Sequence, residues 1–435
     1  MRCTPCRCKP STRAISGTVA PSPASCSTMR RAWVCPAALA IFSPASRRSR
    51  FASKSACSAA SESSTARSID NILSFPYGGG MTTCYRLLAG AVPGFQNAAA
   101  ELAARLERTC WLPETTTTDS SALVRAYTDA WIRWLLQDHS ESLGLHQLVA
   151  VHDGEIQVVR FPGRGRLPML LLHGWPTSFL AFHKVVEPLQ NQASEVILGV
   201  LPGFGVGETS AGGLAISSIA SAFAEAMTTI GHDEFVVHGQ DWGSVVARQM
   251  AAQHPERVLG VHVSAGLRGF IADSVDCGPV WERLRDFADK GSSYLHLQTH
   301  RPQSLAVGLG DSPAGLLAWQ LDKYQLWQGD LGPDFGLGVD FILANATFYW
   351  ATQTIGSSMR IYADNRLPLS MPPSSVPTGV SVFGAGDFAS HRVSARDNNL
   401  IAWYEHSVGG HVAALDAESE FTSDLTDFLT KLEAA

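Results

Sequence analysis

The stretch Phe235-Val236-Val237-His238-Gly239-Gln240-Asp241-Trp242-Gly243-Ser244 decides the fold. It is a short apolar run that ends in Gly-x-Asp-x-Gly, the layout of a sharp strand-to-helix turn that presents a nucleophile between two glycines. Such turns ordinarily carry serine, whereas this chain has Asp241 at that position. A carboxylate is a weak acyl acceptor, but it can open a strained ring or displace a halide at an alkyl carbon. The product is an ester of the protein, which water must then cleave.

The pattern around this turn predicts an α/β fold. From about residue 146, short apolar runs alternate with amphipathic helices, which predicts a mostly parallel sheet flanked by helices. We place the two parts of this core at residues 166–266 and 373–435. The segment 267–372 interrupts the alternation, is rich in Trp and Tyr and has a helical pattern, so it is predicted to be an inserted cap. The runs interpreted as strands are Gln147–Val151, Ile156–Phe161, Met169–Leu172, Val196–Leu201, Phe235–His238, Val258–Val263, Gly379–Phe383 and Leu400–Trp403.

Residues 81–165 precede the core and are predicted to form an N-terminal helical arm. Apolar residues at helical spacing predict helices over Phe95–Arg108 and from about Ser121 to Gln137. The second helix has an apolar stripe that includes Trp131 and Trp134. We interpret this stripe as a packing surface rather than a ligand surface.

Residues 1–80 form a basic leader that is rich in Ser, Ala, Arg and Pro. This composition cannot bury a core, so we expect disorder. The leader resembles a transit peptide, or else it lies outside the functional protein, because Met29 and Met81 are alternative starts. Its apolar run, Ala32–Phe42, is too short to cross a bilayer, which takes about 20 residues. We therefore predict no membrane span.

The charge distribution and the number of cysteines limit the classes of protein to which this chain can belong. Residues 1–70 hold 11 Lys and Arg against 2 Asp and Glu, whereas the other 22 Lys and Arg and 37 Asp and Glu give the body a charge of −15. An acidic body gives no reason to expect nucleic-acid binding. Six of the nine cysteines lie in the leader, and those left are too few for a disulfide framework, which indicates a reduced, cytoplasmic protein. The leader's Cys3-x-x-Cys6-x-Cys8 lacks a second pair at zinc spacing, so no metal site is predicted.

An aspartyl ester needs a general base that activates water. The best candidate is His411, in a glycine-rich loop just after the run Leu400–Trp403. An acid should orient this base and should lie between nucleophile and histidine in the chain, the order found in α/β-hydrolases. Asp387 fits, because it follows the run Gly379–Phe383. The ordered set of Asp241, Asp387 and His411 is stronger evidence than the Gly-x-Asp-x-Gly motif alone.

Hydrolysis of the ester develops an oxyanion, which needs backbone N–H donors. The turn His173-Gly174-Trp175-Pro176 follows the run Met169–Leu172 and could supply the amide of Trp175. The amide of Trp242, directly after the nucleophile, would be the second donor. One such donor is typically worth about 2.7–4 kcal/mol. The alternative is a tight turn with a cis Trp175–Pro176 bond, and both interpretations can hold together.

Together these motifs resemble those of epoxide hydrolases with the α/β-hydrolase fold, on the microsomal-type branch. The resemblance covers about residues 90–435 and leaves the leader outside. It rests on the stretches His173–Leu180, Pro202–Gly205, Gly239–Gly243 and Gly409–His411, on the cap stretch Gln298–Gln303 through Asp311–Leu316, and on the arm region Arg105–Pro113.

The resemblance implies an enzyme that converts an epoxide to a vicinal diol without a metal or an organic cofactor. It also implies two cap tyrosines, Tyr294 and Tyr362, that hold and protonate the epoxide oxygen. Chemistry requires such groups in any case, since ring opening leaves an alkoxide unless an acid stands opposite the nucleophile, and a phenol can donate at pH 7. The alternative for each tyrosine is core packing. The expected partners are an apolar epoxide and water; the sequence leaves open which epoxide, and whether the protein is a homodimer.

One departure from the family and two rival functions remain. Gly384-Ala385-Gly386 places the acid one residue later than is usual, so Asp364 and Asp397 stay as weaker alternatives to Asp387. A haloalkane or haloacid dehalogenase would use the same three residues, with an N–H such as that of Trp242 aimed at the leaving halide. A non-catalytic ligand-binding relative would need no water-activating base. The two cap tyrosines and the arm favour epoxide hydrolysis.

Overall fold

The computed structural model describes residues 83–111, 119–136, 146–152, 154–206, 213–328, 331–366, 371–384 and 386–434. The chain divides into two units, Met1–Cys57 and Ser58–Ala435, and all the described residues belong to the second. The predicted leader of residues 1–80, with its alternative starts, therefore lies outside the described residues.

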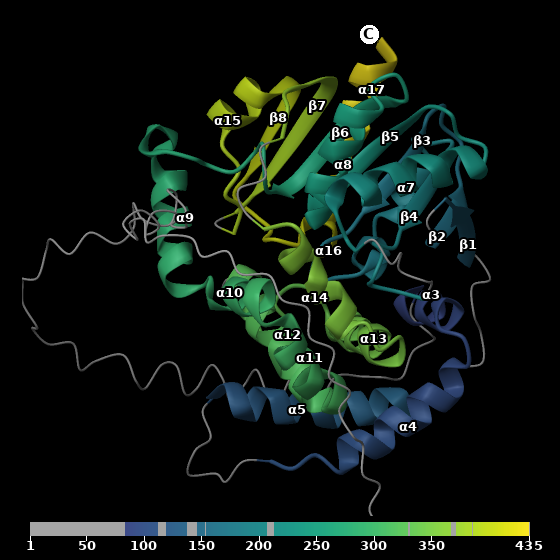
Figure 1. The fold of residues 1–435 in the computed structure, drawn as a ribbon, viewed down its shortest axis with the longest axis vertical. Coiled ribbons are helices and arrows are strands. Elements are labelled where there is room, and N and C mark those ends of the chain that lie inside the picture. Colours follow the sequence, from purple (N-terminus) through teal and green to yellow (C-terminus); the bar gives the residue numbers. More distant parts are fainter. Residues whose placement is uncertain are drawn as a thin grey trace, which may run out of the picture. The chain divides into compact units, whose positions relative to one another are not determined.

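Within the described residues, eight strands form one sheet in the order β1-β2-β4-β3-β5-β6-β7-β8 (Figure 1). β2 pairs antiparallel with both β1 and β4, and every other neighbouring pair is parallel. The predicted mostly parallel sheet is thus confirmed. The strands are β1 (His146–Val151), β2 (Gly154–Pro162), β3 (Pro168–Leu172), β4 (Glu195–Gly199), β5 (Phe235–Asp241), β6 (Val258–Gly266), β7 (Ser374–Phe383) and β8 (Asn398–His406).

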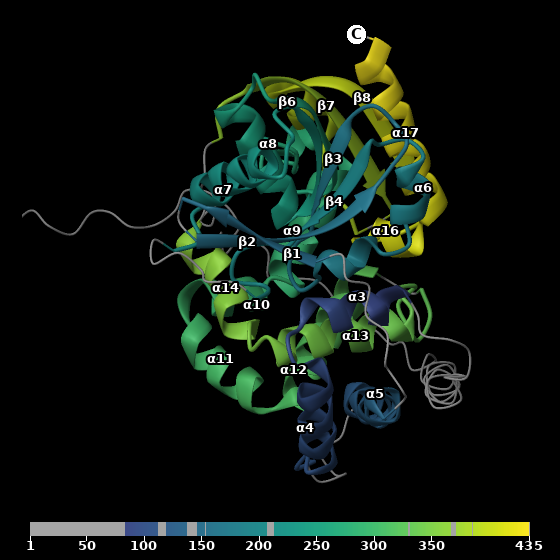
Figure 2. The ribbon, with the colours of Figure 1, turned by 90° about the vertical axis from the view of Figure 1, so that its right-hand side faces the viewer.

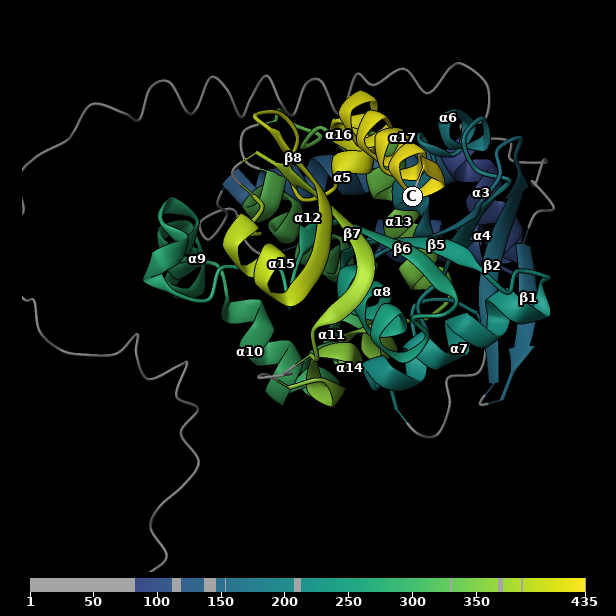
Figure 3. The ribbon, with the colours of Figure 1, turned by 90° about the horizontal axis from the view of Figure 1, so that it is seen from above.

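Helices cover both faces of this sheet, which explains why its central strands are apolar throughout. Every residue of β3, β4 and β5 is buried, as expected of parallel strands between two helical layers. Figures 2 and 3 show α7 (Ile216–Thr229) and α8 (Trp242–Gln253) on one face, and α6 (Val186–Gln190) and α17 (Glu418–Ala434) on the other. Shorter elements connect these layers: η2 (Phe179–Phe182), α15 (His391–Asp397) and α16 (Ala413–Asp416).

The segment between β6 and β7 is helical, as the sequence predicts for the cap. Figure 1 shows its helices gathered beside one edge of the sheet. They are η3 (Val275–Cys277), α9 (Pro279–Lys290), α10 (Ser293–His300), α11 (Pro302–Asp311), α12 (Pro313–Gln328), α13 (Val339–Ala351) and α14 (Ile355–Asp364). In the described part of the chain no helix combines the length and the hydropathy that a bilayer crossing requires.

The arm consists of α3 (Thr83–Ala91), α4 (Phe95–Glu107) and α5 (Asp119–Leu135), and it packs on the cap. The apolar stripe of α5 is a packing surface, since the indole N–H of Trp131 donates to Thr347 Oγ1 at 2.8 Å. The indole N–H of Trp134 donates to Asp340 Oδ1 at 3.0 Å.

The predicted arm boundary at residue 165 is wrong. The described helices of the arm end at Leu135, and β1 and β2 belong to the sheet. The reason is pairing: β2 forms an antiparallel ladder with β4, so residues 146–162 extend the core rather than the arm.

Candidate active site

The turn after β5 has the backbone of a nucleophile elbow. Asp241 ends β5 and precedes α8 with φ 53° and ψ −122°, a conformation that L-residues rarely adopt. Such strain costs on the order of 1–3 kcal/mol and clusters at functional sites. A Cβ atom at Gly239 would lie 2.2 Å from the carbonyl oxygen of Gly243, and one at Gly243 would lie 2.1 Å from that of Leu172. Both flanking glycines are therefore needed for the chain to turn this tightly.

The carboxylate of Asp241 is held by the loop after β3. The side chain is nearly buried, and its Oδ1 accepts a hydrogen bond from the Trp175 N–H at 2.9 Å. The loop can approach this closely because residue 174 is glycine: a Cβ there would lie 2.2 Å from Asp241 Oδ1. The Trp175–Pro176 bond is cis, as the sequence allowed.

The structure brings His411 to the other carboxylate oxygen. Its Nε2 lies 3.4 Å from Asp241 Oδ2. The two groups are in contact without a hydrogen bond, and Nε2 has no hydrogen-bond partner among the residues that the structure describes. The imidazole packs on Trp327 of α12, with ring centroids 4.8 Å apart. His411 is thus beside the nucleophile with one ring nitrogen uncommitted.

Asp387 lies in the loop after β7, which runs beside the His411 backbone: a Cβ atom at the preceding residue, Gly386, would lie 3.6 Å from His411 N. It is 2% exposed, and its carboxylate accepts the N–H groups of Ala265 at 3.1 Å and Ala389 at 2.8 Å. Burial raises the pKa of Asp387, and the Ala389 amide and the charge of His411 oppose this rise.

The two weaker candidates for the acid have other partners. Asp364 accepts the Leu214 N–H at 2.9 Å, and Asp397 pairs with Arg396 at 2.6 Å. Asp387 instead lies in a loop that runs beside the His411 backbone.

Both cap tyrosines are buried against Trp175, the residue whose N–H holds the Asp241 carboxylate. Tyr294 on α10 and Tyr362 on α14 are each 5% exposed. The Trp175 ring stacks on Tyr294 at 5.9 Å and meets Tyr362 edge-on at 5.8 Å. Burial, and then the charges around them, raise the pKa of each phenol well above 10; the negative charge of Asp241 contributes to both. Both therefore stay neutral donors at pH 7.

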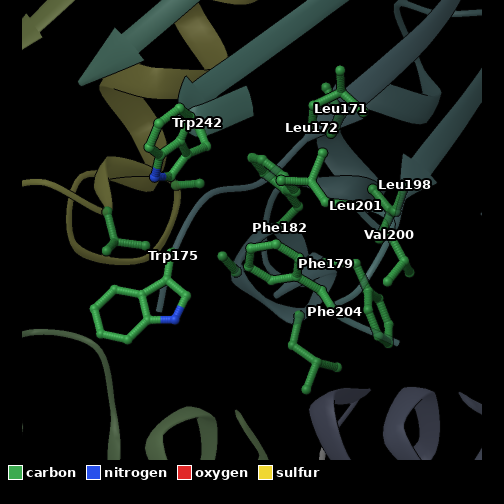
Figure 4. Close-up of a cluster of buried hydrophobic side chains, with 14 of the residues drawn as sticks. Leu171, Leu172, Trp175, Phe179, Phe182, Leu198, Val200, Leu201, Phe204 and Trp242 are labelled. Atoms are coloured by element: carbon green, nitrogen blue, oxygen red, sulfur yellow. The ribbon is translucent and has the colours of Figure 1, made fainter. Parts of the chain in front are cut away.

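Trp242 is the first residue of α8, so its N–H has no acceptor within the helix. This places a backbone N–H without a helical acceptor directly after Asp241, as a second oxyanion donor would require. Its ring packs edge-on against Tyr362 at 5.0 Å. Figure 4 shows Trp242 and Trp175 in a cluster of buried apolar side chains that come from β3, β4 and the segments that follow them.

Sequence reasoning missed two residues next to the base. Gln328, the last residue of α12, and Asp416, in α16, hydrogen-bond the backbone on either side of His411. Burial raises the pKa of Asp416 to about 6, which the hydrogen bond from Gln328 opposes. The position of Asp416, five residues after His411, could have suggested in the sequence that the two lie close together. No feature of the sequence near Gln328 indicates that it contacts the His411 loop.

No metal arrangement accompanies this site in the described residues, where no three His, Cys, Asp or Glu side chains are placed to hold an ion.

The fold and the site define an α/β hydrolase that has aspartate at the nucleophile position. The family described as alpha/beta hydrolase fold matches residues 168–295. The chain is 34% identical over 313 residues to a protein of Stigmatella aurantiaca provisionally named an epoxide hydrolase, a match that covers 68% of this chain and 69% of that protein. It is 28% identical over 317 residues to Epoxide hydrolase 1 of Oryctolagus cuniculus, which covers 62% and 70% of the two chains. The chain belongs to the epoxide hydrolase family.

A solved structure supports the fold. The crystal structure of juvenile hormone epoxide hydrolase from the silkworm Bombyx mori matches with a TM-score of 0.64 at 23% identity, over 77% of this chain and 92% of that one. The predicted α/β-hydrolase fold is thereby confirmed.

Proposed function

We propose that this protein converts an epoxide to a vicinal diol through a covalent ester of Asp241. One observation carries the proposal: two buried phenols, Tyr294 and Tyr362, pack on the ring of Trp175, whose backbone N–H holds the carboxylate of Asp241. Opening an epoxide requires a nucleophile on carbon and a proton donor on oxygen at the same time. This site supplies both at one place.

In the first step, the oxygen of Asp241 that the Trp175 amide does not hold attacks a ring carbon. That oxygen is Oδ2, since Oδ1 accepts the Trp175 N–H. The new bond joins Oδ2 to carbon, and the carbon–oxygen bond of the ring breaks. The released oxygen takes a proton from one of the two phenols. Oδ1 becomes the carbonyl oxygen of the ester and already lies against an N–H donor.

In the second step, His411 Nε2 takes a proton from water, and the hydroxide attacks the Asp241 carboxyl carbon. In this proposal the negative charge of Asp387 stabilises the positive charge of the imidazole. Negative charge develops on Oδ1, where the amides of Trp175 and Trp242 stabilise it. Collapse of this intermediate breaks the ester, and the departing alkoxide takes the proton of the new carboxyl group to give the diol. His411 returns its proton to the phenolate left by the first step, which restores the site. One oxygen of Asp241 then comes from water.

A single turnover in oxygen-labelled water tests this order of events. With enzyme in excess over epoxide, we expect the label in Asp241 and unlabelled oxygen in the diol. Repeated turnover should then move the label into the diol, which serves as the internal control. Label in the first-turnover diol, with none in Asp241, would refute the ester mechanism.

One observation favours dehalogenation as the second candidate. The indole Nε1 of Trp175 is buried and has no hydrogen-bond partner within the described chain. A leaving halide needs N–H donors rather than a proton, and Trp175 and Trp242 carry such groups. Replacing both Tyr294 and Tyr362 with phenylalanine separates the two functions. Epoxide hydrolysis predicts that the double variant loses diol formation, whereas dehalogenation predicts that halide release from a haloalkane persists.

A further inference from the structure

The backbone on both sides of His411 is held by two side chains from different parts of the fold. The Gly410 N–H donates to Asp416 Oδ2 at 2.9 Å, and the Val412 N–H donates to Gln328 Oε1 at 3.2 Å. The Gln328 amide nitrogen also donates to Asp416 Oδ2, which joins the two side chains to each other. The peptide that carries the base therefore lies inside a closed set of hydrogen bonds, which we call the histidine clamp.

The chain has little freedom to replace this contact. Gln328 is 4% exposed, so its amide has no access to bulk water as an alternative partner. A Cβ atom at Gly410 would lie 2.6 Å from Gln328 Oε1 and 3.2 Å from Asp416 Oδ2. Glycine at 410 is thus what allows the two side chains to reach the backbone.

Gln328 also connects the base to the cap. It ends α12, and the preceding residue, Trp327, packs its ring 5.5 Å from Tyr294 and 4.8 Å from His411. The carbonyl oxygen of Trp327 lies 2.4 Å from where a Cβ of Gly386 would be, next to Asp387. The end of one cap helix therefore meets the base, the acid loop and a proton-donating tyrosine.

We infer that Gln328 and Asp416 are positioning residues that hold His411 for hydrolysis of the aspartyl ester. The inference rests on the proposed function. Ester formation uses Asp241 and the tyrosines, whereas only ester hydrolysis needs the base. A displacement of about 1 Å at a catalytic group costs on the order of 10²-fold in rate. Loss of the clamp should therefore slow the second step and leave the first one unchanged.

The test compares Gln328→Met with Gln320→Met in single-turnover experiments. Methionine keeps the volume and burial of glutamine but cannot hydrogen-bond through an amide. Gln320 is the matched control, since it lies on the same helix, is also buried, and has no side-chain hydrogen-bond partner in the described part of the chain. The ester is quantified by mass spectrometry of quenched enzyme, and the diol is measured in the same samples.

For Gln328→Met we expect ester formation at the wild-type rate, ester hydrolysis about 10²-fold slower, and accumulation of the ester. In steady state kcat and KM should then fall together, with kcat/KM unchanged, because slower breakdown of an intermediate lowers both. Gln320→Met should match wild type. A merely structural role for Gln328 would instead lower kcat/KM or slow both steps.

Asp416→Asn provides an independent second variant, because it keeps the side-chain shape and removes the charge of the shared acceptor. The amide oxygen of asparagine still accepts, so this variant weakens the two bonds, which lose their charge assistance, and should slow the same step less than Gln328→Met does. Combining the two variants should add little, since both act on one set of bonds. If both Gln328→Met and Asp416→Asn hydrolyse the ester at the wild-type rate, the inference is overturned, whereas the proposed function is not. Absence of an ester in the wild-type enzyme would instead overturn the proposed function, and the inference with it.

Discussion

Replacing Gly174 with alanine should disable the nucleophile by adding a single methyl group. The new Cβ would lie 2.2 Å from Asp241 Oδ1, 2.4 Å from its Cβ and 2.6 Å from its Cγ. Rotation of the carboxylate could relieve the contact with Oδ1, but the Cβ of Asp241 is fixed to the backbone. The turn after β5 or the loop after β3 must therefore move.

The distance by which the two loops must separate determines the expected loss of activity and of stability. Ordinary contact begins at 3.4 Å, so the two Cβ atoms must separate by about 1 Å. The Trp175 N–H lies 2.9 Å from Asp241 Oδ1 and would lose this acceptor after such a shift. A displacement of about 1 Å at reacting groups costs on the order of 10²-fold. Overpacking typically lowers the free energy of unfolding by about 1–3 kcal/mol.

We therefore expect kcat/KM for diol formation to fall by about 10²-fold or more, with slower ester formation in a single turnover. Urea denaturation should show a folded protein of reduced stability. The matched control is Gly308→Ala on α11, where an added Cβ would meet nothing within 4 Å. It should keep wild-type activity and gain up to about 1 kcal/mol, because alanine favours the helix. A folded Gly174→Ala protein with wild-type ester formation would refute the reasoning.

Three further outcomes can be measured. Removing the hydroxyl of Tyr294 or of Tyr362 by replacement with phenylalanine should slow ester formation by about 10²-fold or more, the usual contribution of a general acid, while hydrolysis of a preformed ester is unchanged. Because the pKa of each phenol lies well above 10, kcat/KM should show no alkaline decline from tyrosine ionisation below pH 10; a decline near pH 9 that disappears in Tyr294→Phe would contradict this. Burial lowers the pKa of His173 from 6.5 to about 4, so the folded protein holds this side chain neutral at a pH where the unfolded chain already binds a proton. The contribution of His173 to the free energy of unfolding is therefore complete above pH 6.5 and is lost as the pH falls to about 4, a loss of about 3 kcal/mol. Urea denaturation across this range should show that His173→Gln flattens the dependence, and an unchanged slope would argue against it.

Much of the fold was predictable from the sequence, because apolar runs and helical periodicity are visible in the order of neighbouring residues. The buried strand β3 contains the uninterrupted apolar run Met169–Leu172 that predicted it. Helix α4 at Phe95–Glu107 matches the predicted Phe95–Arg108, because helical periodicity shows directly in the residue order. β8 at Asn398–His406 is longer than the predicted Leu400–Trp403. It is an edge strand, so its partly exposed ends are polar and its apolar pattern is short.

The sequence by itself determined the chemical types at the site and their order along the chain. Asp241 is identified by two flanking glycines, since only glycine permits the close contacts of that turn. His411 and Asp387 follow predicted strands, and parallel strands bring their carboxyl ends to one edge of the sheet. These are local signals, which residue order carries without knowledge of the fold.

Only the tertiary structure decided which distant groups meet. It places the loop that carries Asp387 against the backbone of His411, a proximity that the order of residues along the chain does not reveal. It also joins Gln328 to a loop 84 residues further along the chain, through the hydrogen bond with the Val412 N–H. Such a contact depends on where the cap docks on the core. That docking results from packing summed over many side chains, so no single motif in the sequence records it.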